Sequence, residues 1–523
     1  MTSQGWPWWV LAPIAGIGGL AASASFMPFN AWPLAFVAVA TLAWATHRAS
    51  TTRAAVLVGW AFGLLFMFTS LIWQTSIMIA SYAGLSLTFS LFYAALGGAL
   101  HLTRTLPASP LWGAAAWTLM EFGTSVFPFD GFAWMRLGYT QIDSWLAGFY
   151  PIAGAASVTF IVALLGHLMA HLALRPNLRR ATAVAATTVI TLAIGLAGLA
   201  WAPHQPESAE TVNVGWVQPG APGGGVYGLG EARTITLNTQ QETGRLAARV
   251  RSGQEPAPDF VVWPENSTDM DPRRDAPTAA AVDAAVADIG VPVIVGSIYT
   301  DDARQERQTV AVRYDGAGAE LVYAKRNLVP FGEWIPFRQF FLPLIPQLAY
   351  VGYQSVPGTT AGHFPVTLAD GRTIEAGVAI CYEVIYPETL YDAARNAQVM
   401  LVQSSNAMYQ GTIQIDQQFA ATRVRAAEMR REVLVVTTTG VSGLIGQRGE
   451  VLDLAPGSVG ASGVHTLPLR ATTTPAMVAA RWVEYVLAAQ GALGVAVGVI
   501  ALRSRRRGGT MEGSPVPAGE VRS

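Results

Sequence analysis

The sequence has few cysteines and few charges. Cys381 is the only cysteine among 523 residues, which excludes an intramolecular disulfide and leaves the redox compartment open. Charged residues make up 13% of the chain, about half of what soluble domains usually carry. The formal net charge is −1, and this balance favours neither an acidic partner nor nucleic acid. We therefore expect no nucleic-acid partner.

Apolar sequence is abundant instead. Hydrophobic residues account for 51% of the chain and the mean hydropathy is +0.35, which is too apolar for a soluble protein. A helix that crosses a bilayer needs about 20 apolar residues. Eight stretches meet or approach this length, and the fifth is the shortest: 8–25, 29–46, 54–76, 80–101, 109–123, 145–173, 182–202 and 482–502.

These spans divide the chain into four predicted regions. An N-terminal membrane domain of seven spans covers 1–203, and 211–470 has the composition of a soluble domain. The last span, 482–502, is followed by a basic tail, 503–523, that is rich in Gly, Pro and Ser and is predicted to be disordered. Residues 21–24 resemble a signal-peptide cleavage site, but no Lys or Arg precedes the first span, which favours a retained span.

The basic residues between the spans predict the orientation. If each span crosses once, almost all of them fall on one side, and Arg136 is the one clear loop residue on the other side apart from the large domain. Lys and Arg prefer the cytoplasmic side. We therefore expect a multi-pass protein of the cytoplasmic (inner) membrane with both termini cytoplasmic and 211–470 outside. The residues on the cytoplasmic side are Arg48, Arg53, Arg104, Arg175, Arg179, Arg180, Arg503, Arg505, Arg506 and Arg507.

The large outer region alternates between two periodicities. Short β-branched runs are typical of buried strands, and longer amphipathic runs are typical of helices. This alternation predicts a layered α/β domain. The strand candidates are 211–217, 260–263, 291–298, 309–314, 374–381, 399–403, 433–438 and 443–445, and the helix candidates are 232–251, 278–289, 388–397 and 415–430.

Three segments of this domain carry residues suited to covalent chemistry. Cys381 ends an apolar strand candidate, although a lone cysteine is more often a small buried hydrophobe. Glu265 follows another strand candidate through Pro264, and strand ends are where α/β sheets bind ligands; the alternative is a surface residue that caps a turn. Lys325 precedes a loop rich in proline and aromatics; alternatively, it extends from a rim with its ammonium in water.

Together these side chains form a plausible catalytic set. A thiol with a pKa near its usual value of about 8.5 is only slightly ionised at neutral pH and needs activation. A carboxylate can take its proton as a general base, and an ammonium can favour the thiolate and stabilise an oxyanion. The sequence does not show whether the three residues meet.

The motifs resemble those of the nitrilase superfamily: Trp-Pro-Glu at 263–265, Lys-x-x-Leu-Val-Pro-Phe-Gly-Glu at 325–333 and Cys-Tyr-Glu at 381–383. With the flanking spans, the whole chain is similar to the apolipoprotein N-acyltransferase family. The resemblance implies an αββα sandwich without metal or cofactor. It assigns Glu265 as base, Lys325 as transition-state stabiliser and Cys381 as nucleophile. Glu333 would be a carboxylate that supports Lys325. Tyr382 and Glu383 would be supporting neighbours of the nucleophile, and the N–H of Tyr382 is a candidate oxyanion donor.

The resemblance also implies the reaction. A phospholipid would donate an acyl chain to Cys381 as a thioester, and the α-amine of a diacylglyceryl-cysteine at an apolipoprotein N-terminus would accept it. One segment could be a lid at the lipid interface, where Trp and Tyr are enriched, or could pack into a core. Its candidate substrate-contacting residues are Phe331, Trp334, Phe337, Phe340, Phe341 and Tyr350.

Two other functions remain open: a membrane-tethered amidase with the same three residues, and a transporter or sensor with an outer binding domain. Several positions depart from the family pattern, notably the segments around Asn406 and Thr438, which affects substrate detail. Glu121 lies in or near the fifth span, where a carboxylate is a functional candidate. His167 and His171 are one helical turn apart, but no third metal ligand is nearby.

Overall fold

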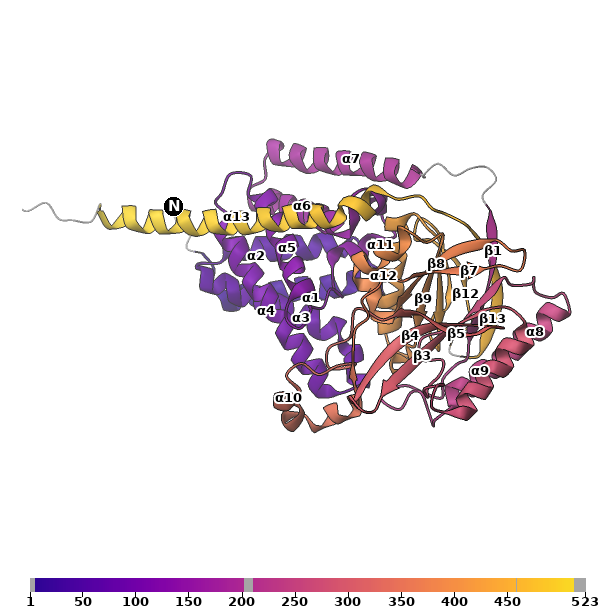
Figure 1. The fold of residues 1–523 in the computed structure, drawn as a ribbon. Coiled ribbons are helices and arrows are strands. Elements are labelled where there is room, and N and C mark those ends of the chain that lie inside the picture. Colours follow the sequence, from indigo (N-terminus) through magenta and orange to yellow (C-terminus); the bar gives the residue numbers. More distant parts are fainter. Residues whose placement is uncertain (1–4, 202–209, 458, 512–523) are drawn as a thin grey trace, which may run out of the picture.

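The computed structural model describes residues 5–201, 210–457 and 459–511. A bundle of helices lies on one side and a domain of two sheets on the other, and the last helix returns along the bundle (Figure 1). Most of the predicted disordered tail, residues 512–523, lies outside the described residues.

The helical bundle consists of α1 to α7 and α13. Among the described residues, six helical segments are long and apolar enough to cross a membrane, and they belong to α1, α3, α4, α6, α7 and α13. α2 has only 15 residues, and α5 carries Glu121 within its 18 residues. The bounds are α1 Trp8–Ser25, α2 Leu34–Arg48, α3 Thr52–Ser70, α4 Ile79–Thr103, α5 Ser109–Val126, α6 Tyr150–Leu174, α7 Leu178–Ala200 and α13 Pro475–Met511. The chain is therefore a multi-pass membrane protein. Six of the eight predicted spans coincide with helices that are both long enough and apolar enough to cross a membrane.

The sheet domain contains two sheets. The first has the order β13-β1-β2-β3-β4-β5, with β6 paired to β4, and the second has the order β12-β11-β10-β9-β8-β7. β1, β2 and β3 run parallel, as do β8, β9 and β10. The bounds are β1 Thr211–Gln218, β2 Phe260–Val262, β3 Val293–Asp301, β4 Glu306–Asp315, β5 Gly318–Ala324, β6 Gln354–Ser355, β7 His363–Thr367, β8 Thr373–Ile380, β9 Val399–Ser404, β10 Val433–Thr437, β11 Gly443–Ile445, β12 Val451–Leu454 and β13 Ala461–Pro468.

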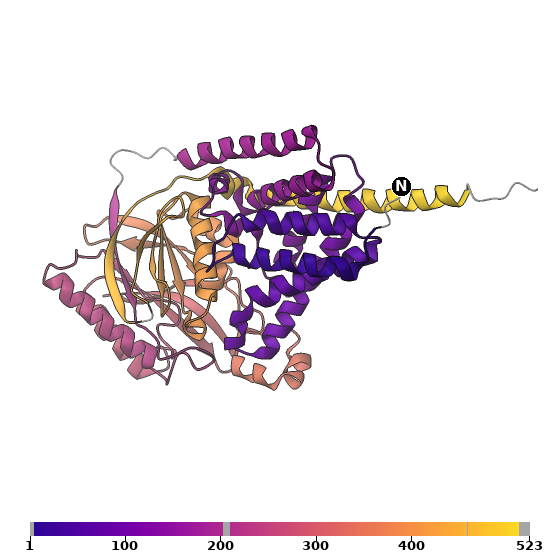
Figure 2. The same ribbon diagram turned by 180° about the vertical axis from the view of Figure 1, so that it is seen from behind.

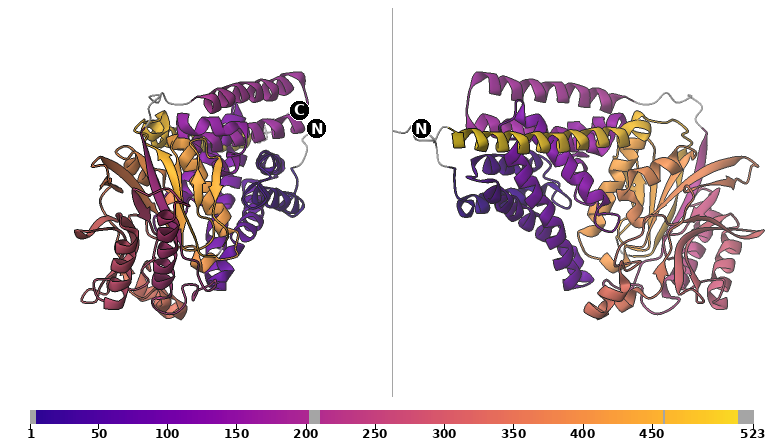
Figure 3. Two further views of the ribbon diagram at one scale, coloured as in Figure 1. Left: turned by 90° about the vertical axis from the view of Figure 1, so that its right-hand side faces the viewer. Right: turned by 60° about the vertical axis from the view of Figure 1, so that its left-hand side comes forward.

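Helices cover the outer face of each sheet, so the domain is the expected αββα sandwich. α8 (Thr234–Arg251) and α9 (Ala276–Ile289) lie on the side away from the bundle, as the left view of Figure 3 shows. α11 (Pro387–Ala394) and α12 (Gln414–Met429) lie between the second sheet and the bundle (Figure 2). One apolar core fills the space between the sheets, and another joins α11 and α12 to the membrane helices.

The predicted outer elements are confirmed to within a few residues. α9 shows why, because its ends carry strong local signals: Asp275 accepts a hydrogen bond from Thr278 N, and the helix ends at Gly290 with φ +74°. Five strands were not predicted, namely β5, β6, β7, β12 and β13. β5 illustrates the reason, since its first four residues are exposed and give no buried apolar run.

A kink in α6 ties the bundle to the sheet domain. Gly154 has φ +74° inside the helix, a conformation that glycine adopts without strain. The break leaves Ala155 N free of its helical partner, and it donates to Glu428 Oε1 of α12 at 2.8 Å. Glu428 is also paired with the buried Arg425, whose Nη2 donates to Tyr139 Oη at 3.0 Å. A buried polar network therefore holds the two domains together.

Candidate active site

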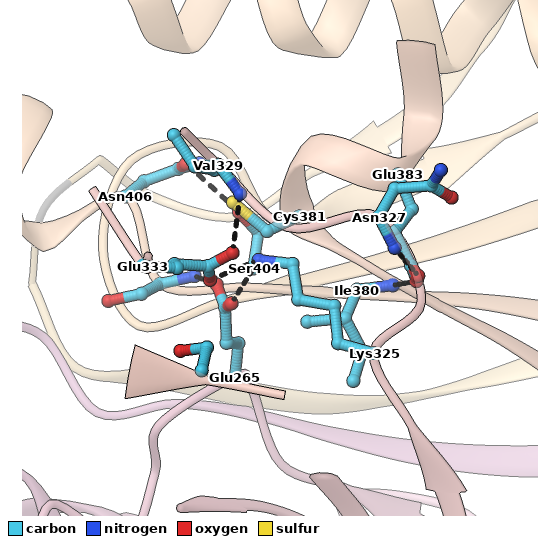
Figure 4. Close-up of polar contacts among 12 residues, drawn as sticks. Glu265, Lys325, Asn327, Val329, Glu333, Ile380, Cys381, Glu383, Ser404 and Asn406 are labelled. Atoms are coloured by element: carbon cyan, nitrogen blue, oxygen red, sulfur yellow. Dashed lines mark hydrogen bonds and ion pairs between the residues drawn. The ribbon is translucent and has the colours of Figure 1, made fainter. Parts of the chain in front are cut away.

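Three strands deliver the three candidate residues to one end of the sandwich. Lys325 directly follows β5 and Cys381 directly follows β8, while Glu265 lies three residues beyond the end of β2. β2 and β5 belong to one sheet and β8 to the other. Figure 4 shows the three side chains converging from these strands. The structure thus brings together the residues that the sequence could not place relative to one another.

Lys325 lies between two carboxylates. Its Nζ is 3.0 Å from Glu265 Oε1 and 2.6 Å from Glu333 Oε1. Lys325 is 1% exposed and Glu265 3% exposed, so solvent screens these contacts little. Burial by itself lowers the pKa of Lys325, but the two carboxylates outweigh it and hold that pKa well above its usual value. The ammonium is therefore charged at any physiological pH.

Backbone amides fix both carboxylates. Ser405 N donates to Glu265 Oε2 at 2.9 Å. Val329 N donates to Glu333 Oε2 at 2.8 Å, and Glu333 N donates back to the carbonyl of Val329 at 2.8 Å. Each carboxylate thus keeps one oxygen for Lys325 and one for the backbone, which is an arrangement preorganised for electrostatic work.

Cys381 occupies a strained turn. Its φ is +53°, which is uncommon for a residue with a Cβ and often marks functional sites. The residue is half-buried, and its Sγ accepts a long contact of 3.9 Å from Gln418 Nε2. Burial, and then the negative charge of Glu265, raise the pKa of the thiol to about 12, and Lys325 only partly opposes them. The resting side chain is therefore a neutral thiol, so the ammonium alone does not produce a thiolate.

Glu383 joins the nucleophile turn to the lysine loop. Its Oε1 accepts from Tyr323 Oη at 2.7 Å and from Arg326 N at 2.7 Å, and its Oε2 accepts from Ile380 N at 2.7 Å. Burial raises the pKa of Glu383 above its usual value, against these hydrogen bonds, which favour the carboxylate. Glu383 thus positions Cys381 and Lys325 relative to each other through the neighbouring residues Ile380 and Arg326.

Tyr382 connects the site to the bundle. Its ring stacks on Phe132 and Trp134, with both pairs of ring centroids 6.4 Å apart, and its Oη lies 3.3 Å from the carbonyl of Gly131. Gly131, Phe132 and Trp134 belong to the loop after α5. Glu121 supports the same loop, since it accepts from Leu137 N at 2.9 Å and from Thr159 Oγ1 at 2.8 Å.

Two glutamines that sequence reasoning missed lie at this junction. Gln418 Nε2 contacts Cys381 and donates to Ser404 Oγ at 3.0 Å. The adjacent Gln417 holds the bundle instead, because its Oε1 accepts from Trp73 Nε1 at 3.1 Å and from Trp134 Nε1 at 2.8 Å. Glutamines recur at 414, 417 and 418 on one face of α12. That spacing could have indicated polar contacts at the site, but it is also typical of a helix face exposed to solvent.

The candidate lid residues divide into two groups. Phe331 and Phe341 pack against Phe129 of the bundle, with ring centroids 5.5 Å and 6.3 Å from it. Trp334 is half-buried. By contrast, α10 (Arg338–Leu344) has no buried residue, and several lid aromatics face outward. They are Phe340 at 62% and Tyr350 at 68% exposure, whereas Phe337 is 75% exposed although its ring centroid also lies 6.1 Å from that of Phe129. Part of the segment therefore packs against the bundle and part of it is exposed, and its role as a lid stays a prediction.

The positions that depart from the family pattern adjoin the site. Asn406 Oδ1 accepts from Ser404 Oγ at 2.9 Å, and Thr438 Oγ1 donates to the carbonyl of Glu265 at 3.1 Å. The two membrane histidines lie elsewhere: His167 contacts the carbonyl of Ala163 and His171 contacts Ser109. In the described part of the chain, no group of three potential ligands could hold a metal ion.

The fold and the convergent Glu, Lys and Cys define a carbon–nitrogen hydrolase domain of the nitrilase type. The carbon-nitrogen hydrolase family model matches residues 236–471, and the model for the apolipoprotein N-acyltransferase N-terminal domain matches residues 18–168. The chain belongs to the apolipoprotein N-acyltransferase family.

Curated relatives of that name cover most of the chain. The protein from Mycolicibacterium smegmatis is 34% identical over 93% of this chain and 84% of its own length. The protein from Azotobacter vinelandii is 30% identical over 87% of this chain and 88% of its own length. Among solved structures, an amidase of the nitrilase superfamily from Nesterenkonia AN1 aligns with 51% of this chain and 93% of its own, at 16% identity and a TM-score of 0.34.

Proposed function

We propose that this protein transfers an acyl chain from a membrane phospholipid to the N-terminal diacylglyceryl-cysteine of apolipoproteins. The observation that carries the proposal is a thiol held beside a buried ammonium and carboxylate at the junction with a bundle of membrane helices. A thiol in this setting suits acyl transfer through a thioester. The site's position beside the membrane helices suits substrates that both carry lipid chains.

The first half-reaction forms the thioester. Cys381 Sγ attacks the ester carbonyl of the phospholipid while Glu265 takes the thiol proton. Lys325 and the N–H of Tyr382 stabilise the oxyanion. Glu265 then gives the proton to the departing alkoxide, which leaves as a lysophospholipid. Because burial and Glu265 raise the pKa of the thiol, proton transfer accompanies the attack and does not precede it.

The second half-reaction consumes the thioester. The neutral α-amine of the acceptor attacks the thioester carbonyl, and the tetrahedral intermediate collapses with Cys381 as the leaving group. Glu265 takes the proton that the amine loses and returns it to the thiolate. The products are an amide and the original thiol, so the two half-reactions together need no further reactant. Excluding water during this step prevents hydrolysis of the thioester.

We further propose that α2 and α5 also cross the membrane, which gives seven spans in 1–203 and an eighth in α13. The catalytic domain, 211–470, then lies outside the cytoplasm and both termini lie inside. Supporting this, both helices pack within the bundle, and α5 contacts α6 and α13. The cytoplasmic end carries Arg48, Arg104 and Arg175, as the positive-inside rule requires.

Mass spectrometry tests the proposed chemistry. The full chain in detergent, incubated with a phospholipid of defined chains, should accumulate Cys381 heavier by one acyl group, with little free fatty acid. Adding a diacylglyceryl lipopeptide should discharge the adduct and acylate the peptide. A short amide offered instead should not be hydrolysed. Turnover of the amide without any lipid adduct would support a membrane-tethered amidase and contradict acyl transfer.

The role of Glu265 predicts a pH dependence of thiol alkylation. Iodoacetamide reacts with the thiolate, so its rate with the wild-type protein should rise about tenfold per pH unit and not level off below pH 11. Glu265→Gln removes a charge that raises the thiol pKa. Its alkylation should therefore level off at a lower pH and be faster at pH 8, while its acyl-transfer rate falls by about a hundredfold or more.

Glu333→Gln is the matched control for that experiment. Glu333 also raises the pKa of the Cys381 thiol, but it is the smallest of the causes named. The substitution should shift the alkylation profile in the same direction by less. A wild-type rate that levels off near pH 8.5 would show an ordinary thiol and would contradict the proposed role of Glu265.

The lid is expected to open for substrate. Lys325 and Glu265 are almost fully buried, so a phospholipid reaches them only if a neighbouring segment moves. α10 has no buried residue, whereas every residue of β9 is buried. Amide hydrogen exchange in detergent micelles should be at least about a hundredfold faster in α10 than in β9. Equal protection of the two would contradict a mobile lid.

A further inference from the structure

A cationic cavity lies at the end of the bundle that is remote from the catalytic site. It has a volume of about 470 Å³. His47 at the end of α2, Arg104 after α4, Ser109 at the start of α5 and His171 at the end of α6 all line it. The catalytic domain instead contacts the opposite ends of α5 and α6, through Gly131 and Ala155. Ala155 and His171 are 16 residues apart along α6, so about 24 Å of helix separates the end that contacts the catalytic domain from the cavity.

The side chains around this cavity share one sign of charge. Arg104, Arg175 and Arg180 contribute three guanidinium groups, and no Asp or Glu is found among the described residues that line the cavity. Arg180 Nη1 donates to the carbonyls of His171 and Arg175 at 2.9 Å and 3.1 Å, which fixes its guanidinium at the rim. Arg175 and Arg180 line the cavity without a lining carboxylate beside them, whereas arginines of the outer domain are commonly paired with an Asp or Glu, as Arg233, Arg273 and Arg470 are.

A helix terminus adds to the same field. α5 begins at Ser109, and its N-cap residue, Ala108, makes no side-chain capping hydrogen bond. The first amide groups of an α-helix lack intrahelical acceptors and carry a partial positive charge. Ser109 and Pro110 line the cavity. Pro110 has no N–H and Leu111 N donates to the carbonyl of Ala108 at 2.9 Å, so this end of α5 contributes its partial positive charge rather than a set of free donors. Arginine side chains together with a helix N-terminus form a characteristic phosphate site.

The geometry points to a binding site for the phosphate headgroup of an anionic phospholipid on the membrane face opposite the catalytic domain. The occupant is a phosphodiester because the guanidinium groups of two arginines, Arg175 and Arg180, offer donors to several oxygens at once. It is a lipid because the cavity lies among the ends of apolar helices, where basic pockets between spans bind headgroups. This site is separate from the acyl-donor site, and its occupancy does not depend on the acyl-transfer chemistry.

Binding of dihexanoyl phosphatidylglycerol to the full chain in neutral detergent tests the proposal. Every protein carries Cys381→Ser so that turnover of the lipid plays no part. Native mass spectrometry resolves successive bound lipids, so the dissociation constant of the cavity lipid is determined apart from that of a lipid in the acyl-donor site, which Cys381→Ser retains. Arg175→Gln with Arg180→Gln should weaken binding at least tenfold. Thr105→Glu should do the same, because it places a negative charge at an exposed lining position without removing an arginine.

The matched control is Arg53→Gln with Arg179→Gln. Both residues are exposed, and neither lines the cavity, although the change in net charge equals that of the Arg175 and Arg180 pair. Control binding should remain within twofold of that of the protein carrying Cys381→Ser alone. Equal weakening in the control would show a diffuse basic surface and overturn the proposal, as would unchanged binding in Thr105→Glu and the Arg175 and Arg180 double variant.

Competition by inorganic phosphate distinguishes a lipid headgroup from a soluble phosphate. If the site takes a lipid, the chains add to its affinity, and millimolar phosphate should displace the phosphatidylglycerol only weakly. Displacement by micromolar phosphate would overturn the assignment to a lipid. Neutral dihexanoylglycerol should not compete, because it lacks the phosphate, and competition by it would show that the cavity binds chains and not headgroups.

Discussion

Cys381→Ser is expected to reduce acyl transfer by at least about a thousandfold and to abolish the acyl adduct at residue 381. A serine hydroxyl is a far weaker nucleophile than a thiol when the only base is a carboxylate, and no histidine faces Cys381 in the described structure. The substitution changes one atom, so the turn with φ +53° and the neighbouring Lys325 contacts should persist. Acyl transfer is measured with a defined phospholipid and a fluorescent diacylglyceryl lipopeptide.

The same variant separates an enzyme from a binding protein. Phospholipid binding should be retained in Cys381→Ser, because the lipid-contacting surfaces are unchanged. Ser405→Ala is the matched control, since only the backbone N–H of Ser405 contacts Glu265; its activity should stay within about threefold of the wild type. If Cys381→Ser kept more than a tenth of the activity, the thioester route would be wrong.

Lys325→Met should have the second-largest effect, on both stability and rate. It leaves the Glu265 and Glu333 carboxylates buried close together without their common cation. Removing one partner of a buried ion pair costs about 3–5 kcal/mol, and losing an oxyanion donor costs about 10²–10³ in rate. We therefore expect a lower unfolding temperature and at least a hundredfold slower acyl transfer. Thermal unfolding by intrinsic fluorescence and the lipopeptide assay measure the two effects.

Two further variants separate the stability effect from the rate effect. Lys325→Met combined with Glu333→Gln has one fewer buried negative charge, so it should regain part of the lost stability but none of the lost rate. Lys325→Arg keeps the charge but replaces a compact ammonium by a planar fork, and it should be more stable than Lys325→Met. If Lys325→Met with Glu333→Gln recovered wild-type activity, Lys325 would be a structural cation only.

The strand and helix pattern of the outer domain could be predicted because it is locally encoded. The apolar runs of β1, β8 and β9 each have six buried residues, and α9 carries its own caps. β5 could not be predicted from such a run, although it positions Lys325. Its exposed first half pairs with β4 at the edge of the sheet, so tertiary pairing and not local pattern decides its conformation.

The sequence by itself determined the membrane and α/β regions, because hydrophobic length and periodicity are local properties of the chain. Through its three motifs it also determined which carboxylate, amine and thiol to consider. Only the tertiary structure decided that Lys325 lies between Glu265 and Glu333, that the thiol of Cys381 is protonated at rest, and that Gln417 and Gln418 join the bundle to the site. These depend on distance and burial among residues up to hundreds of positions apart, which no local pattern encodes.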